Sequence, residues 1–307
     1  MAASEPARGA RVRVSATSAN LGPGFDSLGL ALDLHDDVQV RVGSGGGTRV
    51  SVSGEGAGEV PDGEDHLVVR ALRYALKAAG AEQPDGLHLV CHNAIPHGRG
   101  LGSSAAAVVA GVLAARCLLG DPSALDDDAA LVAATDLEGH PDNAAAALLG
   151  GATIAWTDDV PRAVRVEPHP ELVALAAVPD GRLATHHARA VLPPEVSHDD
   201  AAANVARSAL LVEALTRRPD LLLPATQDRL HQRQRAVAMP VTVELVDVLR
   251  ARGLAAVVSG AGPTVLVLST TARAESDAAV LAEVVAPGWR VRRLAVQRSA
   301  PSATAAC

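Results

Sequence analysis

The stretch of sequence that decides the fold is Pro96-His97-Gly98-Arg99-Gly100-Leu101-Gly102-Ser103-Ser104-Ala105-Ala106. Glycines stand at every second position, and the two serines open an apolar run, residues 105–119, that is typical of a helix. A glycine-rich loop that leads into a helix N-terminus favours anions, because free backbone N–H groups and the helix dipole both attract negative charge. The loop therefore predicts a site for nucleotide phosphates, held by backbone amides with Arg99 as the nearest cationic side chain.

The same loop excludes several familiar nucleotide-binding motifs. It lacks the Gly-x-x-x-x-Gly-Lys-Ser/Thr of a P-loop and the Gly-x-Gly-x-x-Gly spacing of a dinucleotide fold. Lys77 is the one lysine of the chain and lies in a helical pattern, which fits neither a protein kinase lysine nor a Schiff-base lysine. A tight turn capped by Ser103 or Ser104 is the plain alternative, but the density of glycines favours phosphate binding.

Composition narrows the class of protein. The chain has 307 residues, enough for two ordinary domains, and its 48% hydrophobic and 20% charged residues are typical of a globular protein. An aromatic content of 1% and a net charge of −8 argue against nucleic acid and anionic membranes as partners. Residues 1–13 lack the apolar core of a signal peptide, and no apolar run approaches a membrane span. Cys91, Cys117 and Cys307 form neither a metal-type pair nor a disulfide framework, so we expect a reduced, cytoplasmic protein.

Hydrophobic periodicity and turn residues predict two α+β layers, with domains at residues 1–160 and 161–307. Strands 38–42 and 49–53 are expected to form a hairpin around Gly45–Gly47, and Ser197 is expected to cap a helix ending near Thr216. The last residues are small and polar, which predicts a frayed tail. Further strands are expected at 12–14, 86–91, 150–156, 164–166, 172–178, 254–258, 264–268 and 289–296. Further helices are expected at 67–79, 103–119, 123–137, 226–238, 241–252 and 272–285.

A second polar segment, residues 17–26, holds two glycines and the only phenylalanine of the chain, Phe25. Its Asn20 and Asp26 supply an amide and a carboxylate, groups that suit a hydroxyl or an ammonium. An ordinary turn of Asn, Gly, Pro and Asp explains the segment better when it is taken alone.

A third segment, Glu138-Gly139-His140-Pro141-Asp142-Asn143, brings two carboxylates, an imidazole and an amide into six residues. Carboxylate oxygens suit Mg²⁺, while a helix end followed by an Asx turn explains the segment equally well. Zinc is disfavoured, because no further His or Cys stands at ligand spacing. A last segment, Ser259–Thr264, is either a plain hairpin turn or a glycine loop that closes over a bound phosphate.

Together these segments resemble the GHMP small-molecule kinases. The loop 96–106 is similar to the family's phosphate-binding motif, and residues 259–264 are similar to its C-terminal glycine motif. Residues 17–26, 138–143, 185–193 and 228–240 resemble the members that act on homoserine. The resemblance spans Val12 to Val296. It implies an α+β fold of two domains, the N-terminal one like ribosomal protein S5 domain 2 and the C-terminal one ferredoxin-like.

The resemblance also implies an activity and the residues that serve it. The implied reaction is ATP-dependent phosphorylation of the side-chain hydroxyl of L-homoserine, a step in threonine biosynthesis, with a homodimer left open. Asp26, Glu138 and Arg189 are the implied catalytic residues, Ser104 and Glu138 the Mg²⁺ ligands. Implied to wrap the ATP phosphates are Pro96, His97, Gly98, Arg99, Gly100, Leu101, Gly102, Ser103, Ser104, Ala105 and Ala106. Implied to bind the amino acid are Asn20, Asp26, His140, Asn143, Arg189, Arg235 and Gly260, with Asp142 nearby.

Arg189 and Arg235 are implied to hold the substrate carboxylate, a task that suits bidentate guanidinium geometry. Gln232–Gln234 departs from the Glu-Pro-Tyr that is common in the family, so Arg233 competes with Arg235. Asp26 is the nearest candidate base, but an ammonium ligand is poorly free to take a proton, and we expect the proton to leave late, to phosphate. The alternatives are a GHMP kinase for another small alcohol and a catalytically inactive GHMP-like sensor.

Overall fold

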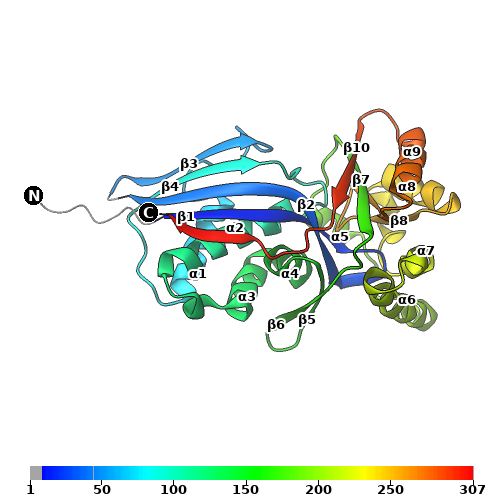
Figure 1. Cartoon of the computed structure of the whole chain (residues 1–307), viewed down its shortest axis with the longest axis horizontal. Coiled ribbons are helices and arrows are strands. Elements are labelled where there is room, and N and C mark those ends of the chain that lie inside the picture. The colour runs from blue at the N-terminus through cyan, green and yellow to red at the C-terminus, as the bar shows by residue number, and fades with distance from the viewer. Residues whose placement is uncertain (1–8, 44, 307) are drawn as a thin grey trace, which may run out of the picture.

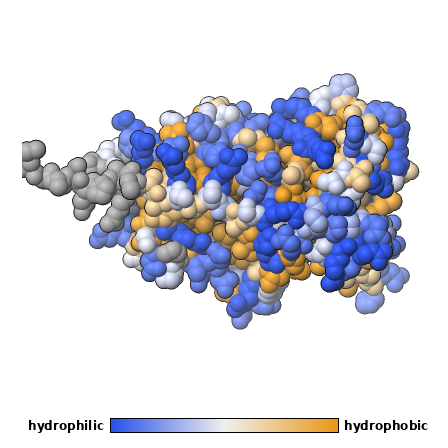
Figure 2. Space-filling model, viewed as in Figure 1, coloured by the Kyte–Doolittle hydropathy of each residue, from blue (hydrophilic) through white to orange (hydrophobic). Residues whose placement is uncertain are grey.

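The structure, a computed structural model, describes residues 9–43 and 45–306, without the side chain of residue 122. Residues 1–8 and Cys307, which entered the predictions on targeting and disulfides, lie outside the described residues. Two α+β units lie side by side along the long axis of the molecule, each with its own sheet (Figure 1). The face in Figure 2 is largely hydrophilic, with small apolar patches between the charged side chains. None of the described helices is both long and apolar enough to cross a membrane.

The first sheet has seven strands, and its helices pack on one face (Figure 1). Its main path runs β11-β1-β2-β4-β3, and β5 pairs with β2 and β6. The strands are β1 (Gly9–Asn20), β2 (Gly24–Gly43), β3 (Gly47–Gly54), β4 (Gly86–Asn93), β5 (Ala152–Thr157), β6 (Pro161–Val166) and β11 (Ser302–Ala306). The helices are α1 (Leu67–Ala78), α2 (Ser103–Leu119), α3 (Asp127–Glu138) and α4 (Pro141–Leu149).

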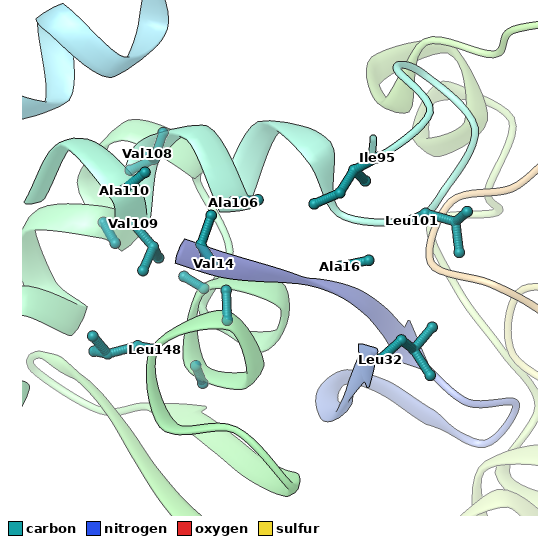
Figure 3. Close-up of a cluster of buried hydrophobic side chains, with 14 of the residues drawn as sticks. Val14, Ala16, Leu32, Ile95, Leu101, Ala106, Val108, Val109, Ala110 and Leu148 are labelled. Carbon is teal, nitrogen blue, oxygen red and sulfur yellow. The ribbon is translucent and has the colours of Figure 1, made fainter. Parts of the chain in front are cut away.

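Helix α2 lies at the centre of the first unit and confirms the helix predicted over 103–119. Its alanines, valines and one glycine let it approach α1 closely: a Cβ on Gly111 would lie 2.4 Å from Val68 O. Figure 3 shows Ile95, just before the glycine loop, and Leu101, within it, in the same apolar cluster as Val14 and Ala106, the last residue of the loop segment. Both ends of the loop are therefore anchored in the core.

The predicted hairpin of residues 38–42 and 49–53 is wrong. Both strands form, but β4 lies between them, antiparallel to β2 and parallel to β3. Helix α1 returns the chain so that β4 enters this slot, as a crossover between parallel strands requires. Gly45, Gly46 and Gly47 all have positive φ, which allows the connection to step across one strand position.

The second sheet has the order β10-β7-β9-β8, with every neighbouring pair antiparallel. Numbered along the chain, this order is 4-1-3-2, with helices between the first and second and the third and fourth strands, which is ferredoxin-like and confirms the predicted fold. The strands are β7 (Leu172–Pro179), β8 (Ala255–Val258), β9 (Val265–Thr270) and β10 (Trp289–Ala295). The helices are α5 (Thr185–Ala190), α6 (His198–Thr216), α7 (Leu222–Ala225), α8 (Pro240–Ala251) and α9 (Ala274–Val284).

All eight residues of β7 are buried, because this sheet has an apolar layer on each face. Ala174 and Ala176 belong to the cluster that continues into the first unit, whereas Leu175 and Ala177 face the cluster under α8. The first sheet also takes β6 and β11 from beyond residue 160. The division into domains 1–160 and 161–307 stays a prediction.

Other expected elements differ in detail. The helix predicted over 123–137 is split into a 3-10 turn, η1 (Pro122–Leu125), and α3, because Asp126 caps α3 through Ala129 N. The helix predicted over 226–238 is wrong: only η3 (Gln234–Val237) forms there. Asp228 instead accepts the backbone N–H groups of Leu230, His231 and Gln232, which satisfies them without a helix. A third 3-10 turn is η2 (Pro219–Leu221).

The predicted frayed tail is also wrong over its described part. Ser302–Ala306 forms β11, which pairs with the outer edge of β1. Its small side chains suit this position, and the pairing satisfies backbone groups that β1 would otherwise leave open. The predicted cap of α6 is confirmed, since Ser197 Oγ accepts a hydrogen bond from Asp200 N.

Candidate functional site

A cavity of about 260 Å³ collects residues from segments far apart in the sequence. It lies where the glycine loop, the end of α3, the start of α4 and the β8–β9 turn meet. The predicted site residues that line it are Asn20, Gly98, Gly100, Gly102, Ser103, Ser104, Ala105, Glu138, His140, Asn143, Arg189, Arg235 and Gly260, together with Asp142. Leu137, Thr185 and Ala261 line it as well and were not predicted.

The glycine loop presents backbone amides at one end of this cavity. Gly102 caps α2 in a left-handed conformation, and no side chain caps the first N–H groups of this helix. Those groups need a partner, and an anion in the cavity would supply one. The glycines are required by close packing, because a Cβ on Gly102 would lie 1.9 Å from Thr17 Oγ1 and one on Gly100 would lie 2.3 Å from Ser259 O.

The β8–β9 turn, Ser259–Thr264, packs directly on the glycine loop. Ser259 Oγ donates to Gly100 O at 2.6 Å, and Thr264 N donates to Arg99 O. Gly260 N donates to Ala19 O at the end of β1. This turn thus joins the loop to the segment that carries Asn20.

The side chains of two predicted loop residues, Arg99 and Leu101, stabilise the fold and do not line the cavity. Leu101 is fully buried in the core. The guanidinium of Arg99 points away from the cavity: Nε donates to Pro179 O and Nη2 to Asp180 O, both at 2.9 Å. The expectation that the Arg99 side chain helps to hold phosphate is therefore corrected: it fastens the loop to the end of β7.

Ser104 and Glu138 meet at the wall of the cavity. Ser104 lies in the first turn of α2, Glu138 is the last residue of α3, and the serine Oγ donates to Glu138 Oε1 at 2.5 Å. Burial raises the pKa of the Glu138 carboxyl. A hydroxyl and a partly buried carboxylate beside an uncapped helix N-terminus are a donor set that fits Mg²⁺ together with phosphate oxygens. Within the described ranges, no three His, Cys, Asp or Glu side chains cluster as a metal site.

Helix α4 brings a second N-terminus to the cavity. His140 occupies its N-cap position without a side-chain cap, and Asp142 and Asn143 lie in its first turn. Burial, and then the charge of Arg189, lowers the pKa of His140, which favours the neutral imidazole. Burial raises the pKa of Asp142 to about 6. Asn143 Oδ1 accepts from Thr17 Oγ1 at 2.7 Å, which ties α4 to β1.

The segment between β1 and β2 is held in an unusual backbone conformation. Asn20, Leu21 and Asp26 are the non-glycine residues with positive φ in the described chain. Such residues cost conformational energy and cluster at functional sites. Asn20 offsets this cost with two hydrogen bonds, from Asp26 N to its Oδ1 at 2.9 Å and from its Nδ2 to Gly260 O at 2.8 Å.

Asp26 is not among the lining residues, but it pairs with Arg189, which is. Arg189 Nη1 donates to Asp26 Oδ2 at 3.1 Å, and Nη2 donates to Oδ1. Arg189 lies near the end of α5 and lines the cavity. Asp26, which suits the substrate ammonium, and Arg189, which is implied to hold the substrate carboxylate, thus contact each other.

Arg235 is almost fully buried, with 1% of its surface exposed, yet it lines the cavity. Its Nε donates to Ala188 O, and its Nη1 donates to Gly260 O and to His231 Nδ1. Burial, and then Arg189, lowers the pKa of Arg235 to about 10, so the side chain stays charged at neutral pH. The competing Arg233 is instead 73% exposed and pairs with Asp247 at 2.8 Å, away from this cavity.

Several residues that support the site were not predicted. Asn204 Nδ2 and Ser208 Oγ, both on α6, donate to Pro23 O, and His231 Nε2 donates to Gly22 O. These bonds hold the 17–26 segment against the second unit. They join residues about 180 to 210 positions apart, and nothing in the local pattern around Asn204 or Ser208 distinguishes them from ordinary helix residues.

A second cavity, of about 280 Å³, adjoins the first and shares Gly98, Ser103 and Ser104 with it. Its lining is mostly apolar, with a few polar groups. Its other lining residues are Val14, Asp36, Val38, Val60, Pro61, Asp65, His66, Leu67, Val68, Asn93, His97, Ala106, Ala107 and Ala110. An apolar cavity beside a phosphate loop suits a nucleoside, and His97 and Ala106 of the predicted set lie here.

Comparison with known proteins agrees with this fold and site. The family model of the GHMP kinases N terminal domain matches residues 66–151, and that of the GHMP kinases C terminal matches residues 201–286. The chain therefore belongs to the GHMP kinase family.

Curated relatives narrow the class within that family. The homoserine kinase of Streptomyces avermitilis is 55% identical over 93% of this chain and 92% of the relative, and that of Mycobacterium tuberculosis is 51% identical over 92% and 90%. The crystal structure of homoserine kinase from Cytophaga hutchinsonii matches with a TM-score of 0.85 at 27% identity, covering 99% of each chain. These relatives place the chain with the homoserine kinases of the family.

Proposed function

We propose that this chain transfers the γ-phosphoryl group of ATP to the side-chain hydroxyl of L-homoserine, which makes O-phospho-L-homoserine for threonine biosynthesis in the cytoplasm. One observation carries the proposal. A single cavity is lined by the N-terminal end of α2, by the Ser104–Glu138 pair and by two arginines, one of which is paired with Asp26. The identity to homoserine kinases over more than nine-tenths of the chain supports the same substrate.

Different residues of the site bind ATP and the amino acid. The amides of Gly98–Ala105 receive the phosphates, and the second cavity receives the nucleoside. Ser104 and Glu138 would hold Mg²⁺, which when bound neutralises phosphate charge and orients the phosphates. Arg189 and Arg235 receive the carboxylate, and Asp26 receives the ammonium, with Asn20, His140, Asn143 and Gly260 around the amino acid.

Catalysis in this site rests on positioning and on charge stabilisation. Asp26 is engaged by Arg189. The carboxylates that line the cavity are Glu138, assigned to the metal, and Asp142, whose charged form burial disfavours. None of these three is placed as a free base. We propose that the hydroxyl proton leaves late, to the phosphoryl group being transferred.

The test is a coupled assay of ADP release with L-homoserine, mevalonate and galactose, with the product identified by mass spectrometry and ³¹P NMR. We expect Mg²⁺-dependent turnover with homoserine and formation of O-phospho-L-homoserine. Turnover with another alcohol but not with homoserine would show that the other alcohol is the substrate. Binding of a ligand without turnover would indicate a sensor.

Glu138→Gln serves as the matched inactive variant: we expect a loss of about 100-fold or more in kcat/KM, since it removes a charged metal ligand. A homodimer stays a prediction.

A further inference from the structure

Phe25, the only phenylalanine of the chain, contacts both arginines of the cavity. The guanidinium carbon of Arg189 lies 5.5 Å from the centre of its ring, and that of Arg235 lies 5.7 Å from it. These distances fall within the range of cation–π contacts. Two cations that serve one carboxylate repel each other before the ligand arrives, and the electron-rich ring offsets part of that repulsion.

A histidine stacks on the same ring. The rings of Phe25 and His231 lie 5.0 Å apart with an angle of 28° between their planes. His231 Nε2 lies 2.8 Å from Gly22 O, a group that only accepts, so this nitrogen carries the proton. Nδ1 is then free to accept from Arg235 Nη1, at 3.0 Å. The neutral imidazole thus fixes one nitrogen of Arg235 from the side.

These contacts leave part of Arg235 for a ligand. Nε and Nη1 are engaged by Ala188 O, Gly260 O and His231, and among the described residues Nη2 has no hydrogen-bond partner. Ala188 precedes Arg189, so the bond from Arg235 Nε also links the two arginines through α5. Phe25 in turn precedes Asp26, the partner of Arg189. The ring of Phe25 therefore contacts Arg189 and Arg235 and is next in sequence to Asp26, the third charged group.

We propose that Phe25 is a positioning residue for the amino-acid substrate: its ring, braced by neutral His231, sets the spacing at which Arg189 and Arg235 bind the two oxygens of one carboxylate. The proposal rests on the proposed function for the identity of the substrate, but the ring–guanidinium geometry exists without it. An aliphatic side chain in place of the ring would keep the hydrogen bonds of each arginine but remove the surface that the two guanidiniums share.

The kinetic test compares Phe25→Leu with Phe25→Tyr, because tyrosine keeps the ring and leucine keeps only apolar volume. We expect Phe25→Leu to raise KM for homoserine about tenfold, the equivalent of about 1.4 kcal/mol over two cation–π contacts. Its kcat and its KM for ATP stay within about threefold, a split that a general packing defect would not produce. Phe25→Tyr restores KM, and Trp156→Leu, which removes a partly exposed aromatic ring from β5, controls for loss of a ring as such.

A second measurement needs no substrate. In ¹⁵N spectra of the ligand-free protein, we expect ring-current shifts of the Arg189 and Arg235 side-chain Nε–Hε signals to disappear in Phe25→Leu and to remain in Phe25→Tyr. If wild type does not phosphorylate homoserine, the proposed function fails while these shifts still test the positioning role. Unshifted arginine signals in wild type, equal behaviour of the leucine and tyrosine variants, or a KM effect that falls equally on ATP would each overturn the proposal.

Discussion

Asp26 and Arg189, 163 residues apart in sequence, form a two-point ion pair whose arginine lines the cavity. The side chain of Arg189 is 27% exposed and that of Asp26 is 34% exposed, so solvent screens the pair and makes it exchangeable. An amino-acid zwitterion carries the same two charges in complementary order. We expect its ammonium to take the place of the guanidinium at Asp26 and its carboxylate to take the place of Asp26 at Arg189.

The first prediction concerns Asp26→Asn. This change removes the charge that receives the ammonium but keeps a hydrogen-bonding side chain of the same shape. We expect KM for homoserine to rise about 10- to 100-fold, the range for truncating one partner of a close charge pair. We expect kcat at saturating homoserine to stay within about threefold, because we propose that Asp26 is a ligand and not a base. A loss mainly in kcat would instead assign it proton transfer.

The second prediction separates two arginines of the same segment. Arg235→Ala removes a buried cation that lines the cavity, and we expect KM for homoserine to rise about 100-fold. Arg233→Ala removes an exposed side chain paired with Asp247, and we expect a change of about twofold or less. Initial rates at varied homoserine and fixed ATP measure both. A larger rise in KM for Arg233→Ala than for Arg235→Ala would show that Arg233 binds the substrate carboxylate.

The third prediction uses the two glycines that flank α2. Gly102 and Gly120 both have φ near +70°, but a Cβ on Gly102 would meet Thr17, whereas nothing lies within 4 Å of one on Gly120. We expect Gly120→Ala to lower the free energy of unfolding by about 1–2 kcal/mol, the cost of left-handed backbone, with normal kinetics. Gly102→Ala adds a steric clash at the phosphate loop.

For Gly102→Ala we therefore expect a larger loss of stability, and a rise of about tenfold or more in KM for ATP because the amides move. Chemical denaturation and steady-state kinetics of the two variants provide the comparison. Equal stability and equal KM for ATP would show that the loop tolerates a side chain, contrary to the packing described above.

The fourth prediction is a pH dependence of stability. Burial raises the pKa of Asp142 from its ordinary 3.8 to about 6, so the folded state binds this proton more tightly than the unfolded chain. The contribution of this group is thus most favourable below about pH 4 and is lost as pH rises through about 6. Asp142→Asn removes the cost of the buried charge, and we expect it to be more stable than wild type by up to about 3 kcal/mol at pH 7.5.

Urea denaturation of both proteins between pH 4 and 7.5 measures that difference. The difference should grow with pH and level off above about pH 7. Asp36, whose pKa burial also raises to about 6, stays in both proteins and cancels from the comparison. A difference that does not change with pH would mean that Asp142 is ionised in both states.

Much of the fold could be predicted from the sequence because its elements are local. Helix α2 begins after Gly102 and ends before Gly120. Ser197 caps the N-terminus of α6. Pairing of strands is not local in this sense. The order β2-β4-β3 depends on α1 carrying the chain back, and β11 depends on the free edge of β1, so both were missed.

In the site, too, residues of local motifs could be predicted, whereas residues that act through distant contacts could not. Motif residues such as Ser104, Glu138, Asn20 and Arg235 could be named from their segments, and the structure brings them to one cavity. Their supports could not be named, since Asn204 and Ser208 act only through Pro23 O, which folding places beside α6. Arg99 shows the opposite error: its position in the glycine loop suggested phosphate, but its side chain binds carbonyls at the end of β7.

The sequence by itself determined where the glycine loop would lead into α2 and which chemical groups would lie near it, because glycine conformation, helix capping and side-chain chemistry are properties of short segments. Only the tertiary structure decided that Arg235 rather than Arg233 faces the cavity, that Asp26 pairs with Arg189, and that Phe25 lies between two guanidiniums. The physical reason is that the contacts of Asp26 with Arg189 and of Phe25 with both arginines join residues more than 150 positions apart. The directions in which Arg233 and Arg235 point are set by how their short segment packs against the rest of the fold.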